Sequence, residues 1–152
     1  MTQTPIPRNS EDITVTMVNK IDKFTLGFQE YDIRELVNHT EKLGQQLVTK
    51  QLKTNQIRKF LDAVKRLKSK LDKSETRDFS VIKDDLVLLR PQLAYAAARQ
   101  QKNNKDLGPV APFKQVLEAA IKQVDTTKDF DKFVQLVESI IAYHKAAGGQ
   151  DQ

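Results

Sequence analysis

Apolar residues recur along most of the chain at intervals of three and four, the spacing that aligns side chains on one face of an α-helix. The pattern is clearest over residues 54–71, where the apolar positions gather on one side of a wheel that advances about 100° per residue. Similar patterns predict further helices over residues 31–51, 79–89, 91–102, 109–124 and 128–147. We therefore expect an all-α fold, a compact bundle of five to six helices.

The first 30 residues carry a weaker signal. Ile13, Val15 and Met17 alternate as in a strand, whereas apolar residues at helical spacing also run from Ile13 to Phe28. We favour a helix docked on the main body, because a lone short helix is marginal in water. Residues 1–12 have no apolar period and are predicted to be a mobile tail. The predicted organisation is a partly disordered N-terminal extension (1–30), a helical bundle domain (31–149) and a tail (150–152).

Local signals predict several helix ends. Asp32 with Glu35 has the spacing of a reciprocal capping pair, and Thr54 is a good N-cap for the next helix. Gly44 lies inside a helical pattern that it weakens, and close approach of a neighbouring helix would explain it. Thr127 is expected to cap the last helix.

The stretch from Leu86 to Lys102 is rich in alanine and contains Pro91, which is suited to the first turn of a helix. We expect a helix break near Arg90, with a deeply buried helix before it. After the break, four alanines surround Tyr95 and Arg99, which share one helix face. The alanines and Tyr95 are predicted to be structural, serving burial and close helix approach.

Composition narrows the function classes. The chain has 152 residues, enough for one domain with a real core, and no cysteine, so disulfides, thiolate zinc sites and cysteine nucleophiles are excluded. No run has the roughly 18 apolar residues of a membrane span, and the N-terminus lacks the features of a signal peptide. We expect a soluble, cytoplasmic protein with no membrane partner.

Positive charge is concentrated in one segment. Residues 51–73 contain eight Lys or Arg and two Asp or Glu, a surplus of +6, whereas the rest of the chain sums to −1. On the wheel, the side opposite the apolar face carries Arg58, Lys59, Arg66, Lys70 and Lys73. Such a helix is typical of a phosphate-binding surface, and a solvated basic face is the alternative interpretation.

We find no residue set suited to catalysis. The chain has no glycine-rich phosphate loop, no HExxH and no G-x-S-x-G motif. The adjacent pair Asp84 and Asp85 would point about 100° apart on a helix, so the two carboxylates do not converge. His39 is interpreted as a surface or cap residue, and His144 as a cap at the end of the last helix. No catalytic residue, metal site or cofactor is therefore expected.

Two sequence blocks and a closing segment occur in a recognisable order: TNQIRKFLDAVKR at 54–66, LLRPQLAYAAARQ at 88–100, and FDKFVQLVESIIAYHKAAGG at 130–149. Together they resemble the small helical subunit of the type III-A CRISPR effector, the Csm complex. The resemblance covers residues 31–149 and does not extend to the first 30. Ala98 stands where related sequences often have glycine.

The resemblance implies a non-catalytic scaffold for antiviral defence. Copies of such a subunit stack in an inner filament along the guide RNA–target RNA duplex, opposite the backbone subunits and next to the large signalling subunit. The motif positions implied to contact RNA are Asn55, Gln56, Arg58, Lys59, Arg66, Arg90 and Arg99. Charge geometry alone adds Lys70, Lys73 and Lys102.

Two alternatives stay open at the level of sequence. One is a helical protein-interaction module whose basic face binds an acidic protein partner. The other, a helix-turn-helix DNA reader, is less favoured because no short second helix follows the basic one across a tight turn.

Overall fold

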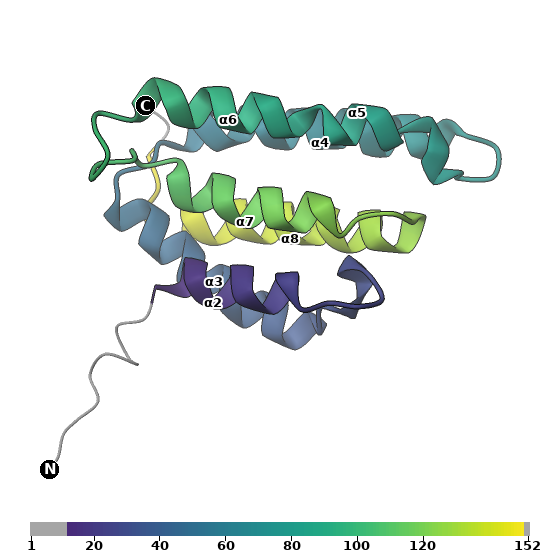
Figure 1. The fold of residues 1–152 in the computed structure, drawn as a ribbon, viewed down its shortest axis with the longest axis horizontal. Coiled ribbons are helices and arrows are strands. Elements are labelled where there is room, and N and C mark those ends of the chain that lie inside the picture. The colour runs from purple at the N-terminus through teal and green to yellow at the C-terminus, as the bar shows by residue number, and fades with distance from the viewer. Residues whose placement is uncertain (1–11, 151–152) are drawn as a thin grey trace, which may run out of the picture.

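The computed structural model describes residues 12–150, and every regular element among them is a helix (Figure 1). In chain order the elements are α2 (Ile13–Asp22), η1 (Phe28–Glu30), α3 (Ile33–Thr49), α4 (Thr54–Lys73), η2 (Phe79–Val81), α5 (Lys83–Val87), α6 (Leu89–Gln100), α7 (Ala111–Lys122) and α8 (Thr127–Ala146). Six of these α-helices have at least ten residues. The prediction of an all-α bundle is confirmed.

The helices form two layers of three (Figure 1). Helices α2 and α6 both pack on α7 in one layer, and α3 and α4 both pack on α8 in the other. Contacts of α2 with α3 and of α7 with α8 join the layers. Helices α7 and α8 are therefore central, and α4 and α6 lie together at one edge of the bundle.

The core lies between the layers. Phe113, Phe130 and Phe133 are fully buried, and Phe60 of α4 packs edge-on against Phe113 of α7 with 5.6 Å between ring centroids. Burying each such ring contributes about 1.5–3 kcal/mol from the hydrophobic effect. Since Phe60 also fixes the rotation of α4, the opposite side of that helix must face solvent.

Helices α3 and α8 approach each other closely at Gly44. A Cβ atom there would lie 2.7 Å from the backbone nitrogen of His144 and 2.7 Å from the carbonyl carbon of Tyr143. The prediction of a close helix approach at Gly44 is confirmed.

The N-terminal region differs from the prediction of one helix over residues 13–28. Helix α2 ends at Asp22, and the chain then turns through Gly27, whose φ of 105° is in the left-handed region. Phe28 is then buried in the short helix η1. Helix α2 is docked on α7 and α3, as expected. Residues 1–11, where most of the predicted tail falls, and 151–152 lie outside the described residues, and the domain boundary at residue 30 stays a prediction.

The segment 79–89 was wrongly predicted as one deeply buried helix. It divides into η2 and α5, and the break before α6 falls at Leu88, two residues earlier than expected. Leu86 and Leu89 are buried, but Leu88 is 57% exposed and Val87 is 48% exposed. The neighbouring helices α4 and α7 therefore cover only one side of this apolar segment.

Two of the three predicted helix caps are displaced by one residue. The Asp32 carboxylate accepts the backbone N–H of Glu35 at 3.1 Å, as predicted. Lys53, not Thr54, is the N-cap of α4, and Thr126, not Thr127, caps α8. Thr54 is instead fully buried, so tertiary packing overrides its local preference.

Candidate nucleic-acid interface

Helix α4 has a buried face and a cationic face. Ile57, Val64 and Leu71 are fully buried, and Phe60 and Leu67 are nearly so. Because these residues occupy one side of the helix, its remaining positions reach solvent. The exposed side chains include each predicted RNA-binding residue of this helix: Asn55, Gln56, Arg58, Lys59, Arg66, Lys70 and Lys73.

Most of the positive charge of this segment has no acidic partner. Lys68 pairs with Asp72 at 3.0 Å, and Lys70 pairs with Asp85 of α5 at 3.0 Å. Among the described residues, no ion pair involves the other six cations of residues 51–73, which are Lys53, Arg58, Lys59, Lys65, Arg66 and Lys73. An anionic ligand would therefore find cations that need not first break a salt bridge.

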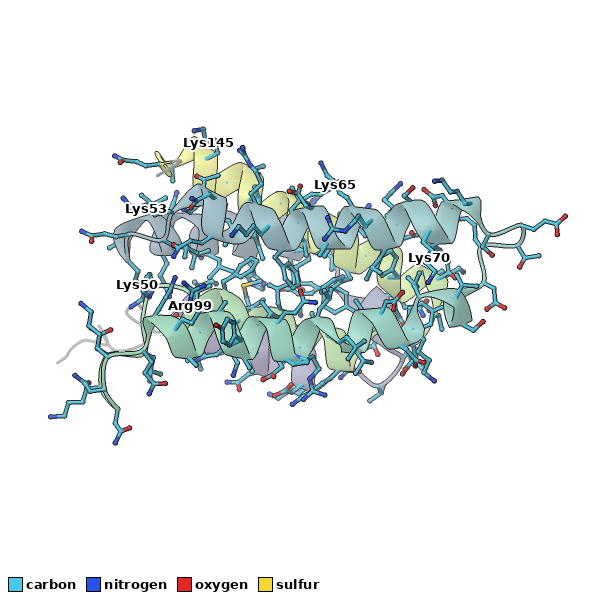
Figure 2. All side chains as sticks on the ribbon, turned by 90° about the horizontal axis from the view of Figure 1, so that it is seen from above. Lys50, Lys53, Lys65, Lys70, Arg99 and Lys145 are labelled. Carbon is cyan, nitrogen blue, oxygen red and sulfur yellow. The ribbon has the colours of Figure 1, made fainter. Side chains whose placement is uncertain are left out.

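Helices α4 and α6 enclose an open pocket of about 320 Å³, which we call the α4–α6 groove. Its lining brings together four of the predicted residues, Asn55, Gln56 and Lys59 from α4 and Arg99 from α6, with Ala96, Gln100 and Val110. Figure 2 shows the two helices side by side on the face turned to the viewer. The groove thus combines two cations with three side-chain amides.

Hydrogen bonds fix two of these amides. The Gln56 Oε1 accepts the backbone N–H of Lys53 at 2.9 Å, and the Gln100 Oε1 accepts the backbone N–H of Val110 at 2.9 Å. With the oxygens engaged, the NH₂ groups are left to donate. Amide and guanidinium donors suit phosphate and ribose oxygens.

Arg99 lies beside Tyr95, with its guanidinium carbon 5.7 Å from the ring centroid. The prediction that Tyr95 packs in the core is wrong, because the side chain is 67% exposed. Helix α6 turns Leu89 and Leu93 to the core, and Tyr95 falls two residues, about 200°, beyond Leu93. Of the four alanines, only Ala97 packs against the core, and Ala94 and Ala98 are exposed.

The other predicted residues lie outside the groove. Arg58 is on the flank of α4 away from α6, by the helical repeat. Arg90 faces α7, where its Nε is buried without a hydrogen bond, 3.8 Å from a carboxylate oxygen of Glu118. Lys102 follows the end of α6 and lines a neighbouring pocket of about 290 Å³ with Lys50.

One end of the molecule gathers basic residues that the sequence patterns did not single out. Figure 2 shows Lys50, Lys53 and Lys145 at the same end as Arg99. The first two flank the link between α3 and α4, and Lys145 is in the last turn of α8. These three lysines come from different segments and share no helical period, so no pattern in the sequence marks them as a group.

His144 holds this end together. Its Nε2 lies 2.7 Å from the carbonyl oxygen of Leu52, and its Nδ1 lies 3.4 Å from the hydroxyl of Thr54. Gln150 accepts the backbone N–H of Thr54 at 2.7 Å. The interpretation of His144 as a cap at the end of the last helix is right in position, since the residue lies in the last turn of α8, but its side chain is fully buried. The imidazole instead ties the end of α8 to the α3–α4 link.

The second histidine, His39, is half-buried, and its Nδ1 lies 2.7 Å from the Tyr31 hydroxyl. Burial, together with Lys20 and Lys42, lowers the pKa of His39 below its usual value against the opposing effect of Glu35. Burial raises the pKa of Tyr31 well above its usual range. This pair lies on α3 and the segment before it, apart from the groove residues.

Residues 12–150 offer neither a metal-binding cluster nor a membrane-spanning helix. No group of three or more His, Cys, Asp or Glu side chains in this part of the chain could hold a metal ion. Within the same residues, no helix combines the length and apolar character needed to cross a membrane.

Comparison with known proteins gives two matches. The model of the family described as Csm2 Type III-A matches residues 30–150. A protein of Streptococcus thermophilus named "CRISPR system Cms protein Csm2" is 36% identical over 100 residues, which cover 66% of this chain and 76% of that protein. The family model spans the residues of the α4–α6 groove, and both matches agree with the family of the resemblance.

Proposed function

Because the chain belongs to the Csm2 type III-A family, we propose that it is the cytoplasmic small subunit of a type III-A CRISPR effector complex and binds RNA without catalysing a reaction. The observation that carries the RNA-binding proposal is the α4–α6 groove, where Lys59 and Arg99 lie with three amides. Most cations of α4 form no ion pair within residues 12–150. In the proposed complex the partners are guide RNA, target RNA, the backbone and large signalling subunits, and further copies of this chain in a filament.

The groove chemistry fits a subunit that must accept any target sequence. Lysine, arginine and amide side chains bind phosphate and ribose oxygens, which are the same in every RNA. In a guide-programmed complex, base pairing with the guide reads the sequence, and the protein recognises the backbone. A scaffold of this kind needs no pocket for a particular base.

The test compares RNA binding of the full chain with that of a variant carrying Arg58→Ala, Lys59→Ala and Arg66→Ala. With about five phosphate contacts, the slope of log affinity against log salt concentration should be near −3.5 for single-stranded RNA. The variant should bind more weakly and with a shallower slope, because each lost contact removes about 0.7 from it. Fluorescence anisotropy with a labelled oligonucleotide at several salt concentrations measures both quantities.

A matched control carries Lys42→Ala, Lys122→Ala and Lys128→Ala, which remove the same charge from α3, α7 and α8. This control should bind RNA much more tightly than the first variant. Equal binding by the wild type and the first variant, or an affinity that salt does not change, would contradict the proposal.

A second candidate function is a helical module that binds an acidic protein through its basic face. The exposed apolar residues Val87 and Leu88 favour a protein partner, because they offer it an apolar contact. Purification of the tagged chain from its native cell separates the two. The RNA-binding proposal expects guide RNA and effector subunits to co-purify, whereas the second candidate expects one protein partner without RNA.

A further inference from the structure

Tyr95 differs from every other aromatic residue of the protein in its exposure. All seven phenylalanines and three tyrosines lie within residues 12–150, and the other nine are buried or half-buried. Tyr95 is 67% exposed. The exposed ring is therefore free to contact a ligand through its apolar face.

The ring lies at the edge of the α4–α6 groove. The Arg99 guanidinium carbon is 5.7 Å from the centroid of Tyr95, and Arg99 itself lines the groove opposite Asn55 and Lys59. Among the described residues Arg99 forms no ion pair. Its guanidinium therefore contacts the Tyr95 ring and remains available to an anion in the groove. A phosphate bound at Arg99 would bring its own nucleotide close to the ring.

A cationic groove with an exposed ring at its edge is the arrangement that binds single-stranded nucleic acid. The groove follows the phosphates, and the ring stacks on a base, which every nucleotide offers whatever its sequence. A base inside a duplex presents only its edges, so it cannot stack on a side chain. We propose that Tyr95 is a stacking platform for an unpaired base of the RNA held in the α4–α6 groove.

The surroundings of Tyr95 favour a base over a protein side chain. One turn along the helix its neighbours are Gln92 and Arg99, and both are exposed. Along the chain before Tyr95, the next large exposed apolar residue is Leu88, seven residues earlier. An isolated ring beside a guanidinium is a small apolar target for a protein, but it matches the face of one base.

The absence of tryptophan from the sequence permits a direct test. Tyr95→Trp introduces one indole into the full chain as a reporter at the proposed site. Titration with a single-stranded oligoadenylate should quench its fluorescence, because stacked bases quench indole emission. A blunt RNA duplex of the same length should quench it much less. Equal quenching by both, or none by the single strand, would overturn the proposal.

Affinity measurements give the second readout. Tyr95→Ala should weaken oligoadenylate binding by about 5- to 150-fold, the cost of one lost base stack, without changing the salt slope. Tyr95→Phe should bind nearly as the wild type does, and Tyr95→Leu should behave as the alanine variant. Because the side chain is exposed, none of these changes should affect folding.

This inference rests on the proposed function, and the two can fail separately. If Tyr95→Ala binds as the wild type does while the Arg58, Lys59 and Arg66 variant loses affinity, the stacking role fails and the RNA-binding proposal stands. If neither variant changes RNA binding, both fail. Loss of a co-purifying protein subunit in Tyr95→Ala, with unchanged RNA affinity, would assign the ring to a protein contact instead.

Discussion

Gly44 and His144 show how strongly a single residue here depends on what the fold places against it. Gly44 lets the backbone of α8 approach α3 at Tyr143 and His144. The imidazole then reaches across to the Leu52 carbonyl at 2.7 Å. One small and one polar residue thereby fix the end of the bundle that carries Lys50 and Lys53.

Gly44→Ala should destabilise the protein. The added methyl group would lie 2.7 Å from backbone atoms of α8, which cannot move as a flexible side chain would. Such overpacking costs about 1–3 kcal/mol, more than the 0.5–1 kcal/mol that alanine gains over glycine within a helix. Urea denaturation measures the free energy of unfolding. Asn38→Ala, an exposed change on the same helix, is the control and should leave stability the same or slightly higher.

At the scale of the element, the segment of α5 and the start of α6 is apolar on more sides than the neighbouring helices cover. Leu86, Leu89 and Leu93 are buried against the bundle. Val87 and Leu88, which share the same apolar run, reach solvent, as do the alanines on the outer side of α6. Helix α6 contacts α7 on one side and leaves the other free for Tyr95 and Arg99.

Leu88→Ala and Leu89→Ala should therefore differ sharply, although the two residues are adjacent. Leu88 is 57% exposed, so its truncation should change stability by less than about 0.5 kcal/mol. Leu89 is 3% exposed, and its truncation should cost about 2–5 kcal/mol through lost burial and a cavity. Thermal unfolding of the pair gives the comparison. Similar losses for both would mean that Leu88 is buried.

At the scale of the whole molecule, charge is distributed unevenly over the surface of the bundle. Two layers of three helices place α4 and α6 at one edge, so the surplus of residues 51–73 is displayed on one side (Figures 1 and 2). Lys70 meets Asp85, but Lys59, Arg66 and Lys73 have no acid within ion-pair distance in residues 12–150. The free protein therefore carries unrelieved repulsion at the surface proposed to bind RNA.

The melting temperature should rise when sodium chloride is increased from about 10 mM to about 300 mM. Salt shortens the Debye length from roughly 30 Å to below 10 Å and so screens the like charges along α4. Arg66 and Lys70 are like-charge neighbours four residues apart, a spacing that costs about 0.2–0.5 kcal/mol per pair at low salt, although Asp85 offsets part of the charge of Lys70. A variant with Lys65→Gln and Arg66→Gln should respond less to salt. A melting temperature that falls with salt would show that attractive pairs dominate instead.

Much of the helical framework could be predicted from local pattern. The apolar positions of residues 54–71 are buried in the structure at Ile57, Val64 and Leu71, and Asp32 caps α3 as its spacing with Glu35 predicts. Both signals act within one helix turn or one helix face, and so they need no knowledge of neighbours. The exposure of Arg58, Lys59 and Arg66 follows from the same period.

The sequence by itself determined most of the helical segments, which face of α4 is apolar and that its other face is cationic, because helix periodicity and side-chain polarity are local properties. It did not determine the breaks after Asp22 and at Leu88. Only the tertiary structure decided that α6 lies beside α4, so that Arg99 meets Asn55 and Lys59. It also placed Tyr95 in solvent and His144 in the core. These outcomes depend on which helices share a layer. Such packing joins segments far apart in the sequence, so no local pattern determines it.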